Sequence, residues 1–333
     1  MELFKPYQLK QLSLKNKVVM APMCQYSAND GYPNNWHYVH YTTRAIGGVG
    51  FIIIEMTNVE PDGRITNQCL GLWEDNQIDA FKEIIDELHK YNTKVSIQIA
   101  HAGRKATDAE IPVSSSDIRY SNKYKTPRAL TTEETYEMIE KFGQAARRAI
   151  EAGVDSIELH GAHGYLIHQF SSSRTNNRKD EFGNDLSLFG RLIIERVRRE
   201  MPKEMPLAIR MSAKEFATDG YDLNHGVWLA KQFKDAGVDI IHVSGGGEGK
   251  PDRARLGKVG PKYMLPFAKE IREKVDIPVI AVGILDEVKD AEDALEDADL
   301  VALGRALLRN PYWVINNDQE HRFVPPQYQR GYL

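Results

Sequence analysis

The stretch AGVDSIELHGAHGYL, residues 152–166, combines three signals that decide the fold. Ala-Gly is typical of the end of a helix, because Gly readily adopts the left-handed conformation that stops one. A short apolar run, Val154–Leu159, follows, and polar residues occupy His160–Tyr165. The tetrapeptide AGVD recurs at Ala236–Asp239. Each copy therefore predicts a junction from a helix into a parallel strand, as in a βαβ unit.

Runs of this kind recur along the whole chain. They are nearly continuous in Val, Ile and Leu, which is typical of parallel strands covered on both faces. The eight runs are Val18–Met23, Val49–Met56, Lys94–Ala100, Val154–Leu159, Pro206–Met211, Val238–Val243, Ile277–Val282 and Leu300–Leu303. We predict an α/β fold: one (β/α)8 TIM barrel in a single domain over 1–333, with a long capping loop, Ala102–Arg128, after strand three.

Amphipathic segments between the runs predict the helices. Thr131-Thr132-Glu133-Glu134 is a capping box, and Gly153 marks the end of the helix that it starts. The predicted helices are Glu74–Tyr91, Thr131–Ala152, Phe189–Glu200, His225–Ala236, Pro261–Val275 and Glu287–Leu295.

Composition narrows the class of protein. The 333 residues are 42% hydrophobic and 27% charged, as in ordinary globular proteins. A net charge of −4 argues against a nucleic-acid partner, which would require clustered Lys and Arg. The longest apolar stretch, Val49–Met56, is too short for a membrane span, and Met1–Asn16 does not resemble a secretory signal. Two cysteines fit a reducing compartment, so we expect a cytoplasmic protein with no membrane partner.

Glycines at the last two strand ends predict a phosphate seat. Gly283 and Gly304 each precede a helix-like segment, so backbone N–H groups can approach an anion, and Arg305 adds a cation. A simple tight turn is the alternative for either glycine alone. The occurrence of both glycines, with an arginine beside one of them, favours a phosphate-binding site over two simple turns.

Two histidines follow strand four. His160 and His163 can converge on one oxygen if the chain leaves the strand at Gly161-Ala162, which would stabilise negative charge developing there. A metal site is not predicted, because no third ligand lies near in sequence. Tyr165 places an acidic hydroxyl close by; a packed aromatic is the alternative reading.

Three further side chains suit a redox cofactor. Cys24, at the mouth of strand one, is either a small core residue or a contact to such a cofactor. Arg210, on strand five, would be a costly buried charge unless an electron-accepting group meets it. Gln98 offers one donor face and one acceptor face, which suit the pyrimidine edge of a flavin.

The chain resembles the old yellow enzyme family over essentially its whole length. The resemblance is carried by Asn16–Cys24, Gln98–Lys105, His160–Tyr165, Ala281–Gly283 and Leu303–Arg305. It is greatest to the bacterial subgroup with a cysteine near the flavin and an arginine borrowed from the neighbouring subunit. This resemblance implies FMN surrounded by Ala21, Pro22, Met23, Cys24, Met56, Gln98, Arg210, Ser244, Gly283, Gly304 and Arg305.

The resemblance also implies an ene-reductase. FMN would take hydride from NADPH or NADH and pass it to the alkene of an α,β-unsaturated carbonyl or nitro compound. His160 and His163 would hold the substrate oxygen, Tyr165 would supply the proton, and Tyr26 would line the pocket. The tail 320–333 would carry Arg330 into the partner's site, so a homodimer or homotetramer with shared active sites is expected.

The chain departs from the family pattern beside this site, at Ser171-Ser172-Ser173, at Ser187-Leu188-Phe189 and at Met56, where a smaller residue is usual. Two alternatives therefore stay open. One is another flavin-barrel reductase, although two cysteines cannot supply an iron–sulfur cluster. The other is a flavin-binding barrel of altered or lost activity.

Overall fold

Eight parallel strands close into a barrel in the computed structural model, which describes residues 1–249 and 259–332. The last strand pairs with the first, Leu303 beside Met20, and the first pairs with the next. The predicted (β/α)8 fold is confirmed. In barrel order the strands are β3 (Val18–Met20), β4 (Phe51–Asn58), β6 (Lys94–Ala100), β9 (Ser156–Gly161), β10 (Leu207–Ser212), β11 (Ile240–Ser244), β12 (Val279–Ala281) and β13 (Leu300–Leu303).

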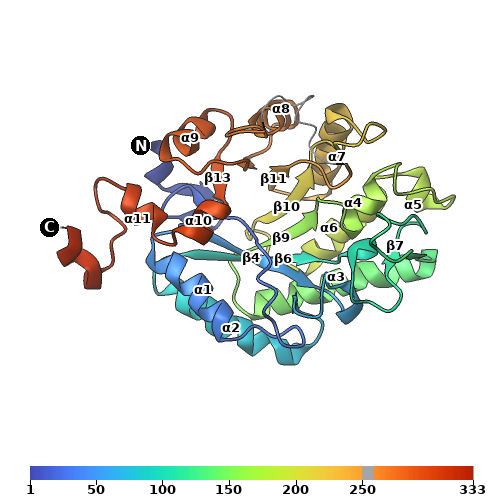
Figure 1. The fold of residues 1–333 in the computed structure, drawn as a ribbon, viewed down its shortest axis with the longest axis horizontal. Coiled ribbons are helices and arrows are strands. Elements are labelled where there is room, and N and C mark those ends of the chain that lie inside the picture. Colours follow the sequence, from blue (N-terminus) through green and yellow to red (C-terminus); the bar gives the residue numbers. More distant parts are fainter. Residues whose placement is uncertain (250–258, 333) are drawn as a thin grey trace.

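Helices ring the strands in Figure 1 and bury their apolar faces against them. They are α1 (Asn35–Ile46), α2 (Ile78–His89), α3 (Thr132–Glu151), α4 (Leu166–Ser171), α5 (Glu181–Asn184), α6 (Leu188–Glu200), α7 (Leu223–Ala236), α8 (Leu265–Val275), α9 (Val288–Asp293), α10 (Arg305–Arg309) and α11 (Trp313–Asn317).

Local signals end and begin these helices as the sequence predicts. Thr131 and Glu134 exchange side-chain and backbone hydrogen bonds in a capping box at the start of α3. Gly153 and Gly237 have φ values of 96° and 121°, which favour Gly, and each follows a helix. The aspartate that follows each of them accepts a backbone N–H of the neighbouring strand: Asp155 from Val95 and Asp239 from Leu207, both at 2.9 Å.

Three sequence-based assignments need correction. Helix α8 begins at Leu265, not at Pro261, because Pro266 fits the first turn of a helix but would break its interior. Helix α1 was not predicted, although Asn34 and His37 form a capping box at its start. The capping loop is not devoid of regular structure, since β7 (Val113–Ser114) pairs with β8 (Arg128–Ala129) within and just after it.

An N-terminal hairpin closes the bottom of the barrel. Its strands are β1 (Tyr7–Leu9) and β2 (Leu12–Leu14), and Leu12 and Leu14 pack against inward side chains of the barrel strands such as Phe51. A further short strand, β5 (Leu70–Gly71), pairs with the end of β4. Because the bottom is filled, polar chemistry is confined to the opposite end, where the strands finish.

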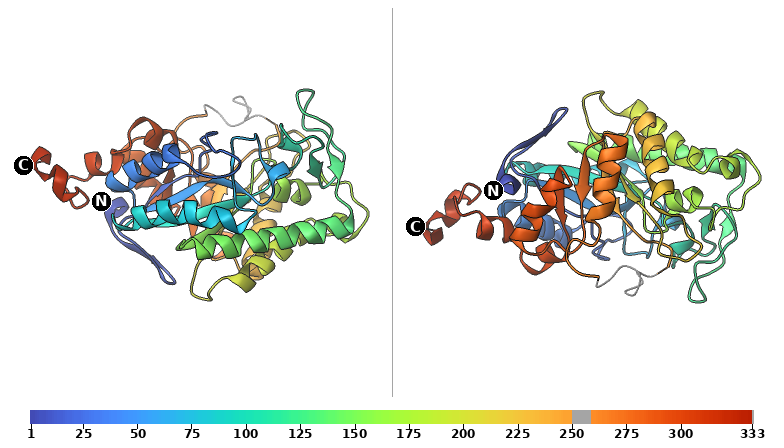
Figure 2. Two further views of the ribbon diagram at one scale, coloured as in Figure 1. Left: turned by 90° about the horizontal axis from the view of Figure 1, so that it is seen from below. Right: turned by 90° about the horizontal axis from the view of Figure 1, so that it is seen from above.

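The C-terminal segment projects from the barrel. In Figures 1 and 2 the end of the chain projects from the body in all three views, whereas nearer α11 Asp318 is buried and Phe323 packs against Phe4. Its last 3₁₀ turns, Pro326–Tyr332, bury no residue. Among the described helices, none is long and apolar enough to cross a membrane.

Candidate active site

The carboxyl ends of four neighbouring strands bring the predicted polar side chains to one rim. Gln98 lies on β6, His160 on β9, Arg210 on β10 and Ser244 on β11. In the register of the sheet Arg210 stands beside His160, and Ser212 stands beside Ser244. Residues from positions 98 to 244 therefore share one end of the barrel, because parallel strands align their carboxyl ends.

The two predicted histidines lie against each other. Strand β9 ends at Gly161, and the ring centroids of His160 and His163 are 5.1 Å apart, edge to face. Nδ1 of His160 accepts the backbone N–H of Ala162 at 3.2 Å, while Nε2 of His163 lies 2.7 Å from Oγ of Ser244. Burial lowers the pKa of both imidazoles well below the usual value, and the Arg210 charge adds to this. Both rings are therefore neutral near pH 7.

A left-handed turn places Tyr165 beside this pair. His163 and Gly164 have φ values of 60° and 71°, and the Tyr165 ring then lies 4.8 Å from that of His160. The turn is fixed by His168, whose Nδ1 accepts the Gly164 N–H at 2.8 Å. Burial raises the pKa of the Tyr165 phenol well above its usual value, so the hydroxyl keeps its proton.

A cavity of about 270 Å³ opens at the ends of the last four strands. Gly283, with φ of 137°, leaves β12 in a conformation that favours Gly and lies at the cavity wall. Six predicted residues line the cavity: His163, Arg210, Ser244, Gly283, Gly304 and Arg305.

Of the remaining predicted contacts, those that follow β3 lead toward Gly304 in the cavity wall. Ala21 is buried and continues the pairing of β3 with β13, since its N–H donates to the carbonyl of Leu303. It leads through buried Pro22 to Met23, whose sulfur lies 3.5 Å from the position that a Cβ on Gly304 would occupy.

Cys24 and Met56 pack in one apolar cluster with Tyr165. Met56 lies where the register of β4 and β6 shifts, between Ile54 and Thr57. A hydrogen bond with Cys69, together with burial, raises the pKa of the Cys24 thiol. Tyr26 is 44% exposed.

Arg210 indicates that the site fits a ligand with hydrogen-bond acceptors. It is 9% exposed, and among the described residues its buried Nε has no hydrogen-bond partner. Burial lowers the pKa of this guanidinium, and nearby Glu158 partly offsets the effect. An unpartnered buried donor costs about 1–3 kcal/mol, so a polar group docked against it would remove that cost. The pyrimidine edge of a flavin presents such acceptors.

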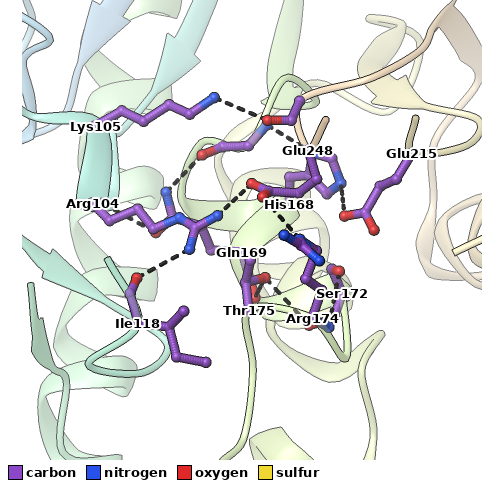
Figure 3. Close-up of polar contacts among 12 residues, drawn as sticks. Arg104, Lys105, Ile118, His168, Gln169, Ser172, Arg174, Thr175, Glu215 and Glu248 are labelled. Atoms are coloured by element: carbon purple, nitrogen blue, oxygen red, sulfur yellow. Dashed lines mark hydrogen bonds and ion pairs between the residues drawn. The ribbon is translucent and has the colours of Figure 1, made fainter. Parts of the chain in front are cut away.

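An ion pair and several hydrogen bonds fix the capping loop over this end of the barrel (Figure 3). Lys105 donates to the backbone carbonyls of His163 and Gly247, at 2.6 and 3.2 Å. Arg104 is paired with the buried carboxylate of Glu248 and donates to the Ile118 carbonyl at 3.0 Å. The loops after β6, β9 and β11 therefore form one connected polar framework around the histidines.

Sequence reasoning missed several residues of the site. Tyr263 and Met264 line the cavity, and no motif marked them. The sequence did contain a signal for His168, because it lies four residues after Gly164. Its side chain can therefore reach the Gly164 N–H across one helical turn. Arg330 is not brought to this chain's own site: it lies on the exposed projecting tail (Figure 2).

One protein family matches the chain over almost its whole length. The model of the NADH:flavin oxidoreductase / NADH oxidase family matches residues 2–322. The NADPH dehydrogenase of Clostridium acetobutylicum is 41% identical over 344 residues, covering 100% of both chains. The NADPH dehydrogenase of Bacillus subtilis is 40% identical over 341 residues, covering 99% of each.

Two solved structures have the same fold over most of this chain. Morphinone reductase matches with a TM-score of 0.80 and 27% identity, over 96% of this chain and 88% of that one. The old yellow enzyme homologue from Zymomonas mobilis matches with a TM-score of 0.79 and 26% identity, over 97% and 92%.

The fold and site define a flavin-binding (β/α)8 oxidoreductase, and the chain belongs to the NADH:flavin oxidoreductase family. The predicted resemblance to old yellow enzyme, the enzyme class and FMN as cofactor are thereby confirmed.

Proposed function

We propose that this oxidoreductase is an ene-reductase that uses NADPH to reduce the C=C bond of α,β-unsaturated carbonyl or nitro compounds. The observation that carries the proposal is the edge-to-face pair of neutral imidazoles, His160 and His163, with the protonated Tyr165 phenol 4.8 Å from His160. Bound FMN supplies the two-electron chemistry. NADPH is proposed as the reductant because the curated relatives are named NADPH dehydrogenases.

The histidines hold the substrate oxygen. Since Nδ1 of His160 accepts a backbone N–H, the proton of this neutral ring is on Nε2, which is left to donate. Ser244 can donate to Nε2 of His163, which leaves that ring's proton on Nδ1. Two fixed N–H donors on one carbonyl or nitro oxygen stabilise the negative charge that develops there during reduction.

Tyr165 supplies the proton. Its hydroxyl stays protonated because burial raises its pKa, and the turn held by His168 keeps its ring against His160. The phenolic O–H can therefore protonate the α-carbon of an alkene whose oxygen the histidines hold. Tyr26, which is 44% exposed, is proposed to line the outer side of the same pocket.

The residues proposed to hold FMN lie on, or just after, seven of the eight barrel strands. Gln98 and Arg210 would contact the pyrimidine edge of the flavin. Gly283, Gly304 and Arg305 would bind its phosphate. The remaining contacts would come from Ala21, Pro22, Met23, Cys24, Met56 and Ser244.

The active unit is proposed to be a homodimer or a pair of dimers. The last turns of the tail, Pro326–Tyr332, carry Arg330 and bury no residue, so they are available to contact a second copy. Arg330 of one subunit would then complete the pocket of the other, within a single domain over 1–333.

The test uses the purified holoprotein under nitrogen. We expect NADPH to bleach the flavin absorbance and 2-cyclohexenone to restore it, and a phenol such as 4-hydroxybenzaldehyde to give a long-wavelength charge-transfer band. Flavin that NADPH reduces but no enone or nitroalkene reoxidises would contradict the ene-reductase and support a flavin-binding barrel of altered activity. Failure of the protein to bind FMN would contradict the proposed site as well.

A further inference from the structure

A carboxylate that no part of the proposed mechanism uses lies directly beneath the cofactor rim. Glu158, on β9, is fully buried, and its two oxygens are taken by different neighbours. Nε2 of Gln98 donates to Oε1 at 2.7 Å, and Nδ1 of His242 lies 2.8 Å from Oε2. Gln98 and His242 are themselves 2% and 0% exposed. The three residues form a hydrogen-bonded chain across β6, β9 and β11 inside the barrel.

This chain fixes the orientation of the Gln98 amide. A carboxylate accepts and never donates, so the group of Gln98 that faces Glu158 must be the NH₂. The carbonyl oxygen and the second N–H of the amide are then turned away from Glu158. These are one acceptor and one donor, the pair that a flavin pyrimidine edge requires from this side chain.

The same carboxylate acts on Arg210. The guanidinium is enclosed on β10 beside His160 and His242, and attraction to Glu158 partly offsets the burial that lowers its pKa. Burial keeps His242 neutral by lowering the pKa of its ring, so this histidine adds a hydrogen bond but no charge. The buried set therefore carries one positive and one negative side chain.

We propose that Glu158, supported by His242, is a positioning residue for the flavin that presents the Gln98 carbonyl to the ring and lowers the reduction potential of bound FMN. The proposal rests on the proposed seating of FMN against Gln98 and Arg210. Reduction adds negative charge to the flavin, and a buried carboxylate nearby disfavours that charge, while Arg210 favours it. Glu158 thus sets how strongly Arg210 stabilises the reduced state.

The charge is tested with Glu158→Gln, which keeps the shape of the side chain. We expect the ratio of reduced to oxidised FMN at a fixed potential to rise at least about tenfold, which is about 30 mV for a two-electron couple. The measurement is a spectroscopic redox titration of the holoprotein against a dye of known potential. A change of less than about twofold overturns the charge role.

Glu55→Gln is the matched control. Glu55 is also a fully buried glutamate, on β4, two strands from β9, but burial raises its pKa to about 8, so it is mostly uncharged at pH 6.5. At that pH the control should leave the potential unchanged. An equal rise of the reduction potential in both variants would mean that any change in the barrel wall shifts it. That result would overturn the proposal.

The geometry is tested separately with Glu158→Asp, which keeps the charge but is one methylene too short to reach Gln98. We expect the Kd for FMN to rise about tenfold, as for a lost hydrogen bond to a charged group. If Glu158→Gln does not fold, this variant still tests the positioning role. An unchanged Kd overturns the positioning role. Wild-type protein that binds no FMN would instead refute the proposed site, so the two failures are distinguishable.

Discussion

Nε2 of His163 lies 2.7 Å from Oγ of Ser244, a residue 81 positions further along the chain on a strand two places around the barrel. This contact sets the orientation of the His163 ring. Because Ser244 also lines the cavity, a single hydroxyl links the proposed cofactor seat to the proposed oxygen-binding pair.

Ser244→Ala should weaken the binding of phenolic ligands about tenfold, the cost of one hydrogen bond that orients a donor. The measurement is a titration of 4-hydroxybenzaldehyde followed at the charge-transfer band. Ser244→Thr, which keeps the hydroxyl, serves as the control. Equal affinities in wild type and the alanine variant would show that His163 is oriented by other contacts.

His160→Ala should lower turnover of 2-cyclohexenone about 10² to 10³-fold, the typical cost of losing one donor to a developing oxyanion. Reduction of the flavin by NADPH is expected to change much less. Steady-state rates and single-turnover reduction separate the two effects. A turnover close to that of wild type would remove His160 from the oxygen-binding pair.

Tyr165→Phe should slow reoxidation of the reduced flavin by an enone about 10²-fold or more, because the phenolic proton is lost while the ring still packs on His160. Stopped-flow measurement of each half-reaction provides the test, and the exposed Tyr136→Phe is the control. If reduction and reoxidation fall equally, Tyr165 has a packing role and not a chemical one.

Arg330 can be tested by complementation between subunits. Arg330→Ala and His160→Ala should each be poorly active alone. Co-expressed with different tags and isolated as a hybrid, they should recover activity, because one of the two sites then has its own His160 and the partner's arginine. A hybrid no more active than its parents would show that Arg330 does not act across subunits.

The buried carboxyl of Glu55 predicts a pH dependence of stability. Burial raises its pKa in the folded protein to about 8, against an ordinary value of 4.5. The folded state therefore binds this proton more tightly than the unfolded chain does, and stability falls as the pH rises from 4.5 to 8. Burial lowers the pKa of neighbouring His37 to about 4, so the contribution of this group makes stability rise with pH. That rise ends near the ordinary pKa of 6.5 and does not affect the range above it.

Between pH 6.5 and 8, the Tm of wild type should thus decline relative to that of Glu55→Gln, by about 2 °C or more. Differential scanning calorimetry of both proteins across this range checks the difference. Parallel curves would mean that Glu55 is ionised throughout.

The sequence by itself determined the barrel. Eight apolar runs predicted eight strands because strands covered on both faces have no solvent side, and their pattern is therefore local. The helix ends were equally local, since Thr131 caps a residue three positions away and Gly153 needs only its own φ. Resemblance along the chain added the residues proposed to contact the cofactor, and Gly283 and Arg305 do line one cavity.

Only the tertiary structure decided how the polar groups are paired. Gln98 meets Glu158 across 60 positions, and Arg104 meets Glu248 across 144, in contacts that no local pattern encodes. Such pairs arise because closing the barrel aligns the ends of distant strands, and burial then obliges each polar group to find a partner there. A glutamate in an apolar run can destabilise the fold, balance a positive charge or hold a neighbouring side chain in place. Which of these it does depends on the closed barrel, because its neighbours come from other strands.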